Sequence, residues 1–185
     1  MHRYVIAGRN IMNRISTLTL ATMAVAVAMP AGDALAQHRQ HVSYKVGAEN
    51  SKYTQQQNVD MRDVPNHLLR IFEVHRTFPT NAPVVNGLKI VEVWNSGIAD
   101  RIDGRGPLTE YDVYMAGEGD KFFCRVDGMS QQVSPGRFTV TTFGPITGGT
   151  GKFTGIEGTV RGSATFEPVT GFNETQIDID YSIGK

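Results

Sequence analysis

From residue 68 onward, apolar and polar side chains alternate in short runs that are separated by Gly, Pro, Asn and Asp. The runs are too short for helices, and turn residues recur about every ten positions, which is typical of an all-β sandwich or barrel. Each run predicts one strand of an antiparallel sheet in which hairpins join neighbouring strands. The expected strands are residues 69–78, 88–95, 98–102, 108–115, 122–126, 138–143, 158–167 and 175–183.

Strands of this number and length favour an eight-stranded antiparallel up-and-down β-barrel, because closing the sheet removes both exposed edges. A barrel of about eight strands is just wide enough to be filled by side chains or to hold one small ligand. We place this β-barrel domain at residues 67–185. Residues 37–66 are polar, include Gln55-Gln56-Gln57 and show neither strand nor helix periodicity, so we predict a flexible polar arm there.

Residues 1–36 have the features of a secretory signal peptide. Arg9 and Arg14 precede or flank an uncharged apolar run at residues 15–29, and Ala34-Leu35-Ala36 gives the small-x-small pattern of a cleavage site. The run is shorter than the roughly 20 apolar residues that a spanning helix needs. We therefore predict cleavage after Ala36, export to the periplasm or secretion from a bacterium, and no stable membrane insertion after cleavage.

The charge balance and the cysteine count narrow the classes of partner and cofactor. Removal of residues 1–36 takes away three arginines and one aspartate and leaves 15 basic and 17 acidic residues, a net charge of −2. This balance provides no basic surface for nucleic acid, so we expect no nucleic-acid partner. Cys124 is the only cysteine, which excludes an internal disulfide. No three or four His and Cys residues have the spacing of a metal site, so we expect no metal and no other cofactor.

A glycine-rich segment carries the most specific motif in the chain. Residues 144–159 read GPITGGTGKFTGIEGT, in which Gly148-Gly149-Thr150-Gly151 and Phe153 are followed by Gly155 and Gly158. This pattern resembles the hairpin signature shared by the plant allene oxide cyclases and the dirigent proteins. Gly104-Arg105-Gly106 is similar, more weakly, to the start of a dirigent strand. The resemblance covers residues 104–185 and, less fully, the chain from residue 88.

The resemblance implies a calycin-type barrel that works without a cofactor and binds a small hydrophobic or aromatic ligand. It also implies an isomerase or cyclase type of activity, in which confinement holds a reactive intermediate in a productive shape. Family members are commonly homodimers or homotrimers, so we expect a homo-oligomer. The alternative is a non-catalytic ligand-binding protein, or an oligomeric interaction protein of the cell envelope. In either case the glycines shape a barrel corner, which Phe153 can plug from inside, and carry no chemistry.

Glu92 is the candidate catalytic residue. In a regular strand it shares a face with Leu88, Ile90 and Trp94, and a carboxylate among apolar groups is costly unless it is paired or functional. It would stabilise a developing cation or act as a base. The alternative is that this face points outward into an oligomer interface with Glu92 at its rim. The segment Glu92-Val93-Trp94-Asn95 is one residue longer than the Glu-x-Asn motif of cyclase-type members, so Asn95 falls on the opposite face.

The remaining candidates would line the barrel. In the strand at 108–115, Tyr111 and Met115 form the more apolar face, opposite Glu110 and Asp112. Arg105 lies in a charged turn that either grips a carboxylate at the barrel mouth or is simply solvated. The predicted ligand-binding residues are Tyr111, Trp94, Met115, Phe122 and Arg105.

Two further groups have a structural and a functional interpretation. Cys124 shares a face with Phe122 and is expected to be a small buried hydrophobe, because no histidine near it in the sequence would activate the thiol. Glu73 and His75 share a strand face and form either an acid–base pair or two residues with separate structural partners. The face from Thr159 to Glu167 is uniformly polar, which predicts contact with solvent.

Overall fold

The computed structural model describes residues 38–117 and 119–184, so the predicted signal peptide at 1–36 lies outside the described residues. This part of the chain consists of ten strands and two short 3-10 helices. No helix in the described part of the chain is long and apolar enough to cross a membrane. The elements are β1 (Gln40–Val46), η1 (Ala48–Asn50), β2 (Ser51–Asp60), β3 (His67–Thr77), β4 (Val84–Val85), β5 (Leu88–Ile102), β6 (Gly106–Ala116), β7 (Lys121–Ser134), β8 (Arg137–Gly149), η2 (Gly151–Phe153), β9 (Ile156–Glu167) and β10 (Phe172–Ile183).

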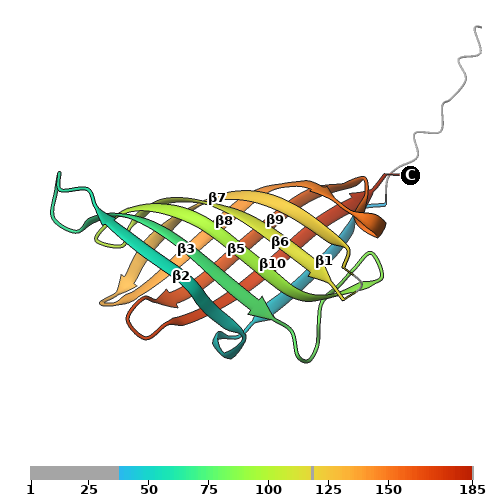
Figure 1. The fold of residues 1–185 in the computed structure, drawn as a ribbon, viewed down its shortest axis with the longest axis horizontal. Coiled ribbons are helices and arrows are strands. Elements are labelled where there is room, and N and C mark those ends of the chain that lie inside the picture. Colours follow the sequence, from blue (N-terminus) through green and yellow to red (C-terminus); the bar gives the residue numbers. More distant parts are fainter. Residues whose placement is uncertain (1–37, 118, 185) are drawn as a thin grey trace, which may run out of the picture. The chain divides into compact units, whose positions relative to one another are not determined.

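One antiparallel sheet contains nine of these strands, in the order β1-β10-β9-β8-β7-β6-β5-β3-β2, and the short β4 pairs with β5 (Figure 1). From β5 to β10 each strand lies beside the next in the chain, which confirms the expected all-β, antiparallel, up-and-down arrangement. The two strands expected at 88–95 and 98–102 are one continuous strand of 15 residues, β5. Ser96 and Gly97 therefore lie within a strand and form no turn.

The first two strands correct the prediction of a flexible arm at 37–66. β1 pairs with β10 from Gln40–Tyr181 to Val46–Thr175, and β2 pairs with β3 over most of its length. Backbone hydrogen bonds hold a strand in a sheet whatever its side chains are. Nearly all side chains of β2 are exposed, so the strand lacks the apolar alternation by which sequence analysis recognises one.

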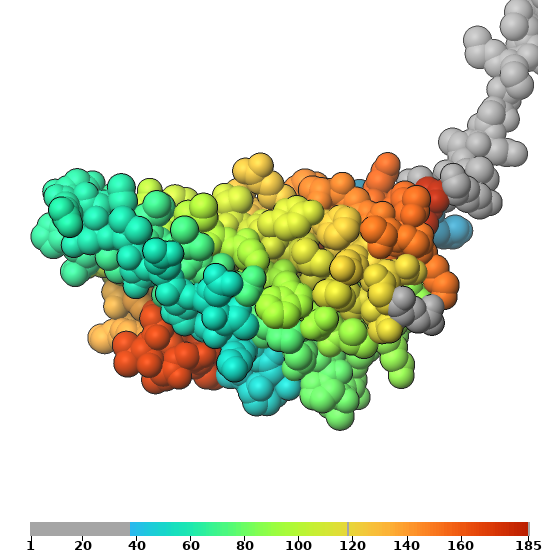
Figure 2. Space-filling model, in the orientation of Figure 1, coloured from blue at the N-terminus to red at the C-terminus, as the bar shows by residue number. Residues whose placement is uncertain are grey.

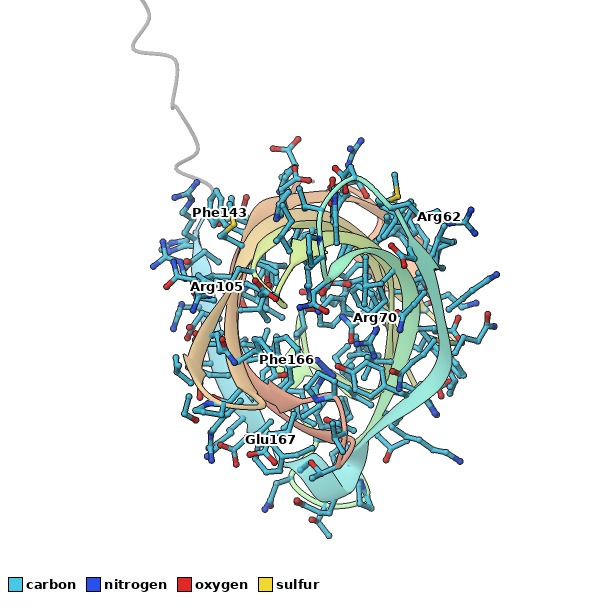
Figure 3. All side chains as sticks on the ribbon, turned by 90° about the vertical axis from the view of Figure 1, so that its left-hand side faces the viewer. Arg62, Arg70, Arg105, Phe143, Phe166 and Glu167 are labelled. Carbon is cyan, nitrogen blue, oxygen red and sulfur yellow. The ribbon has the colours of Figure 1, made fainter. Side chains whose placement is uncertain are left out.

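The sheet curls so that one of its faces encloses an interior, as the end-on view in Figure 3 shows. Side chains meet across this interior, since Arg76 of β3 donates to Thr175 of β10 and Asn173 of β10 donates to Tyr53 of β2. The edge strands of the path are β1 and β2, and no backbone ladder joins them within the described residues. The sheet thus has more strands than the expected eight-stranded barrel, and its hydrogen-bonded ladder is not closed.

An extra residue in β5 decides which side chains face inward. Ile90 pairs with Ala116 and Glu92 pairs with Met115, which leaves Val91 as a β-bulge. A bulge of one residue reverses the alternation of the side chains that follow it. Leu88 and Ile90 face the interior before the bulge, and Val93, Asn95 and Ala99 face it afterwards.

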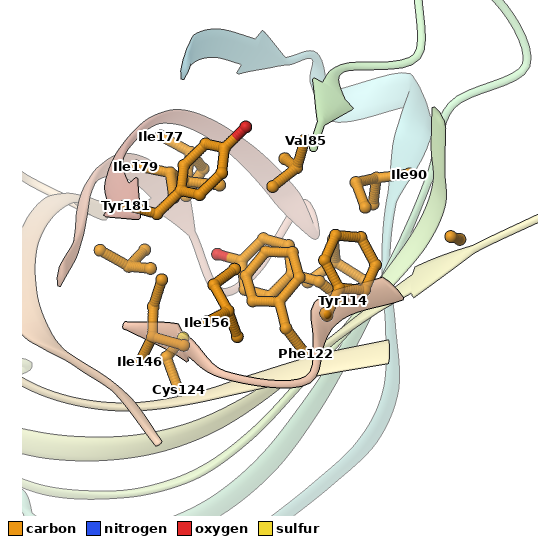
Figure 4. Close-up of a cluster of buried hydrophobic side chains, with 14 of the residues drawn as sticks. Val85, Ile90, Tyr114, Phe122, Cys124, Ile146, Ile156, Ile177, Ile179 and Tyr181 are labelled. Atoms are coloured by element: carbon orange, nitrogen blue, oxygen red, sulfur yellow. The ribbon is translucent and has the colours of Figure 1, made fainter. Parts of the chain in front are cut away.

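Apolar side chains fill one half of the interior (Figure 4). The glycine-rich hairpin between β8 and β9 closes this half: Phe153 of η2 is fully buried and packs edge-on against Phe122 with ring centroids 5.2 Å apart. Gly151 and Gly155 have φ values of 54° and 76°, a left-handed conformation that glycine adopts without strain. The expectation that Phe153 folds inward is confirmed, as is the burial of Cys124 beside Phe122.

Candidate ligand site in the interior

The other half of the interior is polar and contains a cavity of about 40 Å³, which we call the inner cavity. A space of this size accommodates a few waters or one small polar group. Alternation of side chains on six strands brings its polar lining together, because every second residue of each strand points inward. The polar and charged residues that line it are Tyr53, Arg70, Arg76, Asn95, Arg101, Glu110, Asp112, Thr142, Asn173 and Thr175.

The inner cavity is surrounded by guanidinium groups that lack anionic partners. Arg76 is only 6% exposed, and its Nη2 donates to Thr175 Oγ1 at 3.0 Å and to Asn173 Oδ1 at 3.4 Å, while its Nε and Nη1 have no partner. The Nε atoms of Arg70 and Arg101 are also buried without a partner. Among the described residues, none of these three arginines forms an ion pair with a carboxylate. Burying an unpaired charge is costly, which marks this cluster as a functional candidate.

Two arginines at the cavity lie against aromatic rings. The guanidinium of Arg70 lies 5.4 Å from the ring centre of Tyr53, and its Nη2 donates to Gln56. The guanidinium of Arg101 lies 5.0 Å from the ring centre of Phe166. Burial and the neighbouring charge of Arg70 lower the pKa of Arg101. Cation–π contact partly offsets the lost hydration of the two groups, but it leaves their in-plane N–H donors available.

Two carboxyl groups of β6, Glu110 and Asp112, face the same cavity. Burial, followed by the charge of Asp112, raises the pKa of Glu110 to about 8. Burial also raises the pKa of Asp112, to about 6, against the opposing effects of the Asn95 amide and of Arg76. Because the two groups titrate as a coupled pair, the pair keeps a proton at a higher pH than isolated carboxyl groups would. The three guanidinium groups outnumber these two carboxyl groups, so the polar half of the interior has an excess of positive charge.

Asp112 is held in place by its neighbours on both sides. It is 3% exposed, and it lies opposite Asn95 of β5 and Cys124 of β7 in the sheet. The Cys124 thiol donates to Asp112 Oδ2 at 3.5 Å, whereas Oδ1 is buried without a partner. Burial and the nearby charge of Asp112 raise the pKa of the thiol well above its usual value, so Cys124 is an inert neutral donor.

A second pocket, of about 170 Å³, opens at the end of the sheet that faces the viewer in Figure 3; we call it the mouth pocket. Its apolar walls are Leu68, Phe138, Phe166 and Pro168. Arg70, Arg101 and Phe166 line both the mouth pocket and the inner cavity. A molecule that enters the mouth pocket would therefore place its leading end at the arginines.

The hairpin between β2 and β3 projects at this end of the sheet (Figures 1 and 2). His67, at its base, contacts Asp63 through Nδ1 and Asp100 through Nε2, both at 2.6 Å. The hydrogen bond to Asp100, and to a smaller extent the one to Asp63, raises the pKa of His67. Asn66 donates to Asp103 Oδ1 at 2.8 Å. Both contacts connect the hairpin to β5 and to the turn that follows it, at the edge of the mouth pocket.

The structure places Glu92 and Trp94 on the outer face of β5, away from the inner cavity. Glu92 Oε2 lies 2.7 Å from Nε2 of His75, whose ring stacks on Trp94 at 3.9 Å. The prediction that Glu92 lies in the barrel is wrong because the bulge at Val91 reverses the alternation. Leu88 and Ile90 point inward, so the alternative of an outward apolar face around Glu92 is also wrong.

Tyr111 and Met115 also lie on the outer face, where Tyr111 is 48% exposed and stacks with Phe123. The more polar face of β6 is the inward one, because it meets the arginines of β3 and β5. Phe122 does face the interior as expected, but it packs within the apolar half against Tyr114 and Phe153.

The other candidates lie at the surface. Arg105 is exposed in the turn between β5 and β6 and donates to Gln132 at 3.4 Å. Glu73 accepts hydrogen bonds from Thr54 and Ser96, and His75 contacts Glu92, so the two residues have separate partners. The face from Thr159 to Glu167 points outward, as expected. Within residues 38–117 and 119–184, no group of three His, Cys, Asp or Glu side chains is placed to hold a metal ion.

Sequence analysis overlooked the arginines, although β3 contains a signal for them. Arg70, Phe72, Val74 and Arg76 alternate along one face, so that two charges bracket two apolar residues. Two charges on an otherwise apolar strand face are unusual, and they lie opposite the face that contains Glu73 and His75. Arg101 had no comparable signal, because the bulge at Val91 decides which face of β5 it lies on.

Comparisons with known proteins leave the family open. No protein-family model matches the chain, and no curated protein matches it. Among solved structures the chain is similar to a protein of unknown function from the DUF3224 family of Shewanella oneidensis MR-1. That similarity has a TM-score of 0.46 and 12% sequence identity, and it covers 79% of this chain and 100% of the other. The resemblance to allene oxide cyclases and dirigent proteins therefore stays a prediction.

Proposed function

We propose that the curled sheet acts as a small barrel that binds an apolar or aromatic molecule carrying an anionic group. The observation that carries this proposal is the cluster of Arg70, Arg76 and Arg101 at the inner cavity, where buried N–H donors lack partners and the three guanidinium groups outnumber the carboxyl groups of Glu110 and Asp112. An anion in the inner cavity would accept these hydrogen bonds and reduce the excess positive charge. Charge-assisted hydrogen bonds of this kind are the stronger class in proteins.

The mouth pocket supports the apolar part of the ligand. Leu68, Phe138 and Phe166 give it aliphatic and aromatic walls, and it continues directly to Arg70 and Arg101. Ligand sites generally combine an apolar lining with a few convergent polar groups that fix the orientation. The anionic group would point into the sheet and the apolar body would fill the mouth.

Calorimetry with benzoate and octanoate as probes tests the proposal. We expect Arg70→Met and Arg101→Met each to weaken binding by about tenfold or more, because each removes a buried donor to the anion. Arg161→Met is the matched control, since Arg161 lies on the outer face of β9 beside Phe143. Equal affinities for all three variants and the wild type would contradict the proposal, and so would equally tight binding of octanol. Mass spectrometry of small molecules that co-purify with the protein would identify the natural ligand.

A second candidate function is a cofactor-free isomerisation or cyclisation inside the sheet. The observation that favours it is the pair of carboxyl groups at one cavity: burial raises the pKa of Glu110 to about 8 and that of Asp112 to about 6, so the pair offers a proton donor and a proton acceptor to the same ligand. Incubation of the co-purified ligand with protein would then give a product of the same mass, and Glu110→Gln and Asp112→Asn would each stop its formation. A ligand recovered unchanged would leave binding as the function.

We also propose that the outer face forms a homo-oligomer. Ile71, Ile98 and Tyr111 are 45–50% exposed and surround a shallow groove on β3, β5 and β6. Exposed apolar patches of this kind are typical of interaction surfaces. Sedimentation of the wild type is expected to show a dimer or trimer that Ile98→Glu converts to a monomer. A wild-type monomer would exclude this assembly.

A further inference from the structure

Glu110 lies where it can interact directly with an anion in the inner cavity. It lines this cavity together with Arg76 and Arg101, and Gly97 lies opposite it on β5. A Cβ atom at Gly97 would stand 2.9 Å from Glu110 Cγ and 2.7 Å from the ring of Phe72. The side chains of Glu110 and Phe72 therefore occupy space that is free only because residue 97 is glycine. The carboxyl group is thus held at the cavity, in contact range of whatever the arginines bind.

The groups that face Glu110 come from several strands. Asp112 lies two residues after Glu110 on β6. The other charged or titratable groups at the cavity are Arg101 of β5, Arg70 and Arg76 of β3, and Tyr53 of β2. Cys124 of β7, a neutral thiol, lies behind Asp112. The cavity-lining residues of β8, β9 and β10 are not titratable; they are Val140, Thr142, Val160, Gly162, Ala164, Phe166, Asn173, Thr175 and Ile177.

From this arrangement we infer that the anionic group of the ligand is a carboxylate, and that protonated Glu110 donates a hydrogen bond to it while the arginines hold its charge. The inference rests on the proposed function and specifies its ligand. A carboxylate has two oxygens in one plane, so it can accept from a guanidinium and from a carboxyl O–H at once. It is also small enough for a cavity of about 40 Å³. When Glu110 loses its proton, its carboxylate repels the anionic group of the ligand and competes with it for the guanidinium groups.

This competition makes binding depend on pH in a defined direction. Because burial raises the pKa of Glu110 to about 8, the residue is protonated at neutral pH and ligand affinity is at its full value there. Above about pH 8 the affinity falls, by up to about tenfold per pH unit, since binding then requires the uptake of one proton. Asp112 titrates lower, near pH 6, so the two residues affect separate parts of the pH profile.

Calorimetric titration of octanoate between pH 6.5 and 9.5, in pairs of buffers with different ionisation enthalpies, tests the inference. For the wild type we expect affinity to fall above about pH 8 and up to one proton to be taken up per ligand. Glu110→Gln keeps a neutral donor, so it is expected to bind octanoate with a flat profile and no proton uptake. Glu157→Gln is the control, because Glu157 is exposed on β9, and it should behave as the wild type.

The possible results separate this inference from the proposed function. Octanoate binding that depends on Arg70 and Arg101 but not on pH, without proton uptake, would overturn the role of Glu110 and leave the proposed function standing. Inorganic phosphate that binds at the same arginines more tightly than octanoate would overturn the carboxylate assignment. No binding of either probe at any pH would overturn both proposals. A Glu110→Gln variant that retains the wild-type pH profile would also exclude the inference.

Discussion

Arg76 of β3 donates a hydrogen bond to Thr175 Oγ1 of β10 at 3.0 Å, across the interior of the curled sheet. The two residues lie 99 positions apart in the chain, and their strands are not neighbours in the sheet. The contact exists only because the sheet curls far enough to bring opposite strands together. It leaves two nitrogens of the guanidinium without partners, and these nitrogens are buried.

Replacing Arg76 by methionine separates its role in binding from its role in stability. Arg76→Met is expected to weaken octanoate binding by about tenfold or more, because a buried cation is lost from the site. The free energy of unfolding should change by no more than about 1 kcal/mol, since the lost hydrogen bonds are offset by removal of an unneutralised buried charge. Urea denaturation of the wild type and of Arg76→Met measures this difference in the free energy of unfolding. A loss of about 3 kcal/mol or more would mean that Arg76 has a structural partner that compensates its charge.

Phe153 is expected to anchor the glycine-rich hairpin. Phe153→Ala should lower the free energy of unfolding by about 3–5 kcal/mol, because a fully buried ring packed against Phe122 is replaced by a cavity. The control is Phe143→Ala, since Phe143 is 52% exposed on the outer face. Chemical denaturation of both variants provides the comparison, and similar losses in the two would show that the hairpin does not depend on Phe153.

Gly97 is expected to tolerate no side chain, because of close contacts on β5. A Cβ atom there would stand 2.7 Å from the backbone oxygen of Thr109, and backbone cannot move as a flexible side chain does. Gly97→Ala should cost about 1–3 kcal/mol of unfolding free energy. In Gly117→Ala the new Cβ meets only Val91 Cγ1, at 3.4 Å, so a much smaller change is expected. Equal effects on thermal stability would contradict the close approach at Gly97.

Stability should fall as the pH rises from about 4.5 to about 8. The pKa of Glu110 is raised from 4.5 to about 8 in the folded state, so its contribution is fully present below pH 4.5 and is lost as the pH rises through about 8. Asp112 contributes in the same direction between 3.8 and about 6. The raised pKa of His67 also has this sign. The melting temperature of Glu110→Gln and of Asp112→Asn should change less with pH between pH 5 and 9 than that of the wild type. An unchanged slope in both variants would exclude these carboxyls as its source.

Glu92 is expected to have no role in ligand binding. Its carboxylate contacts His75 on the outer face, where a partly exposed contact of this kind is worth about 0–1 kcal/mol. Glu92→Gln should therefore leave octanoate affinity unchanged and lower the unfolding free energy by less than about 1 kcal/mol. A loss of binding as large as that of Arg101→Met would place the site on the outer face.

The sequence alone determined the class of the fold and much of its apolar half. Alternation and recurrent turn residues predicted antiparallel strands in hairpins, since both signals are local and act within about ten residues. The same local reasoning predicted that Phe122 and Cys124 face inward and that the glycine-rich hairpin turns Phe153 into the core. The signal peptide and the activity stay predictions.

Tertiary structure decided the polar strands, the bulge and the site. Exposed β2 is a strand because β3 offers it backbone partners, which its side chains do not reveal. The bulge at Val91 depends on the register between β5 and β6, and that single residue moved Glu92 outward and Asn95 inward. Arg76 and Asp112 face the interior because charged groups from distant strands lie there too. Burial of a charge depends on partners far away in the chain, and no local pattern encodes them.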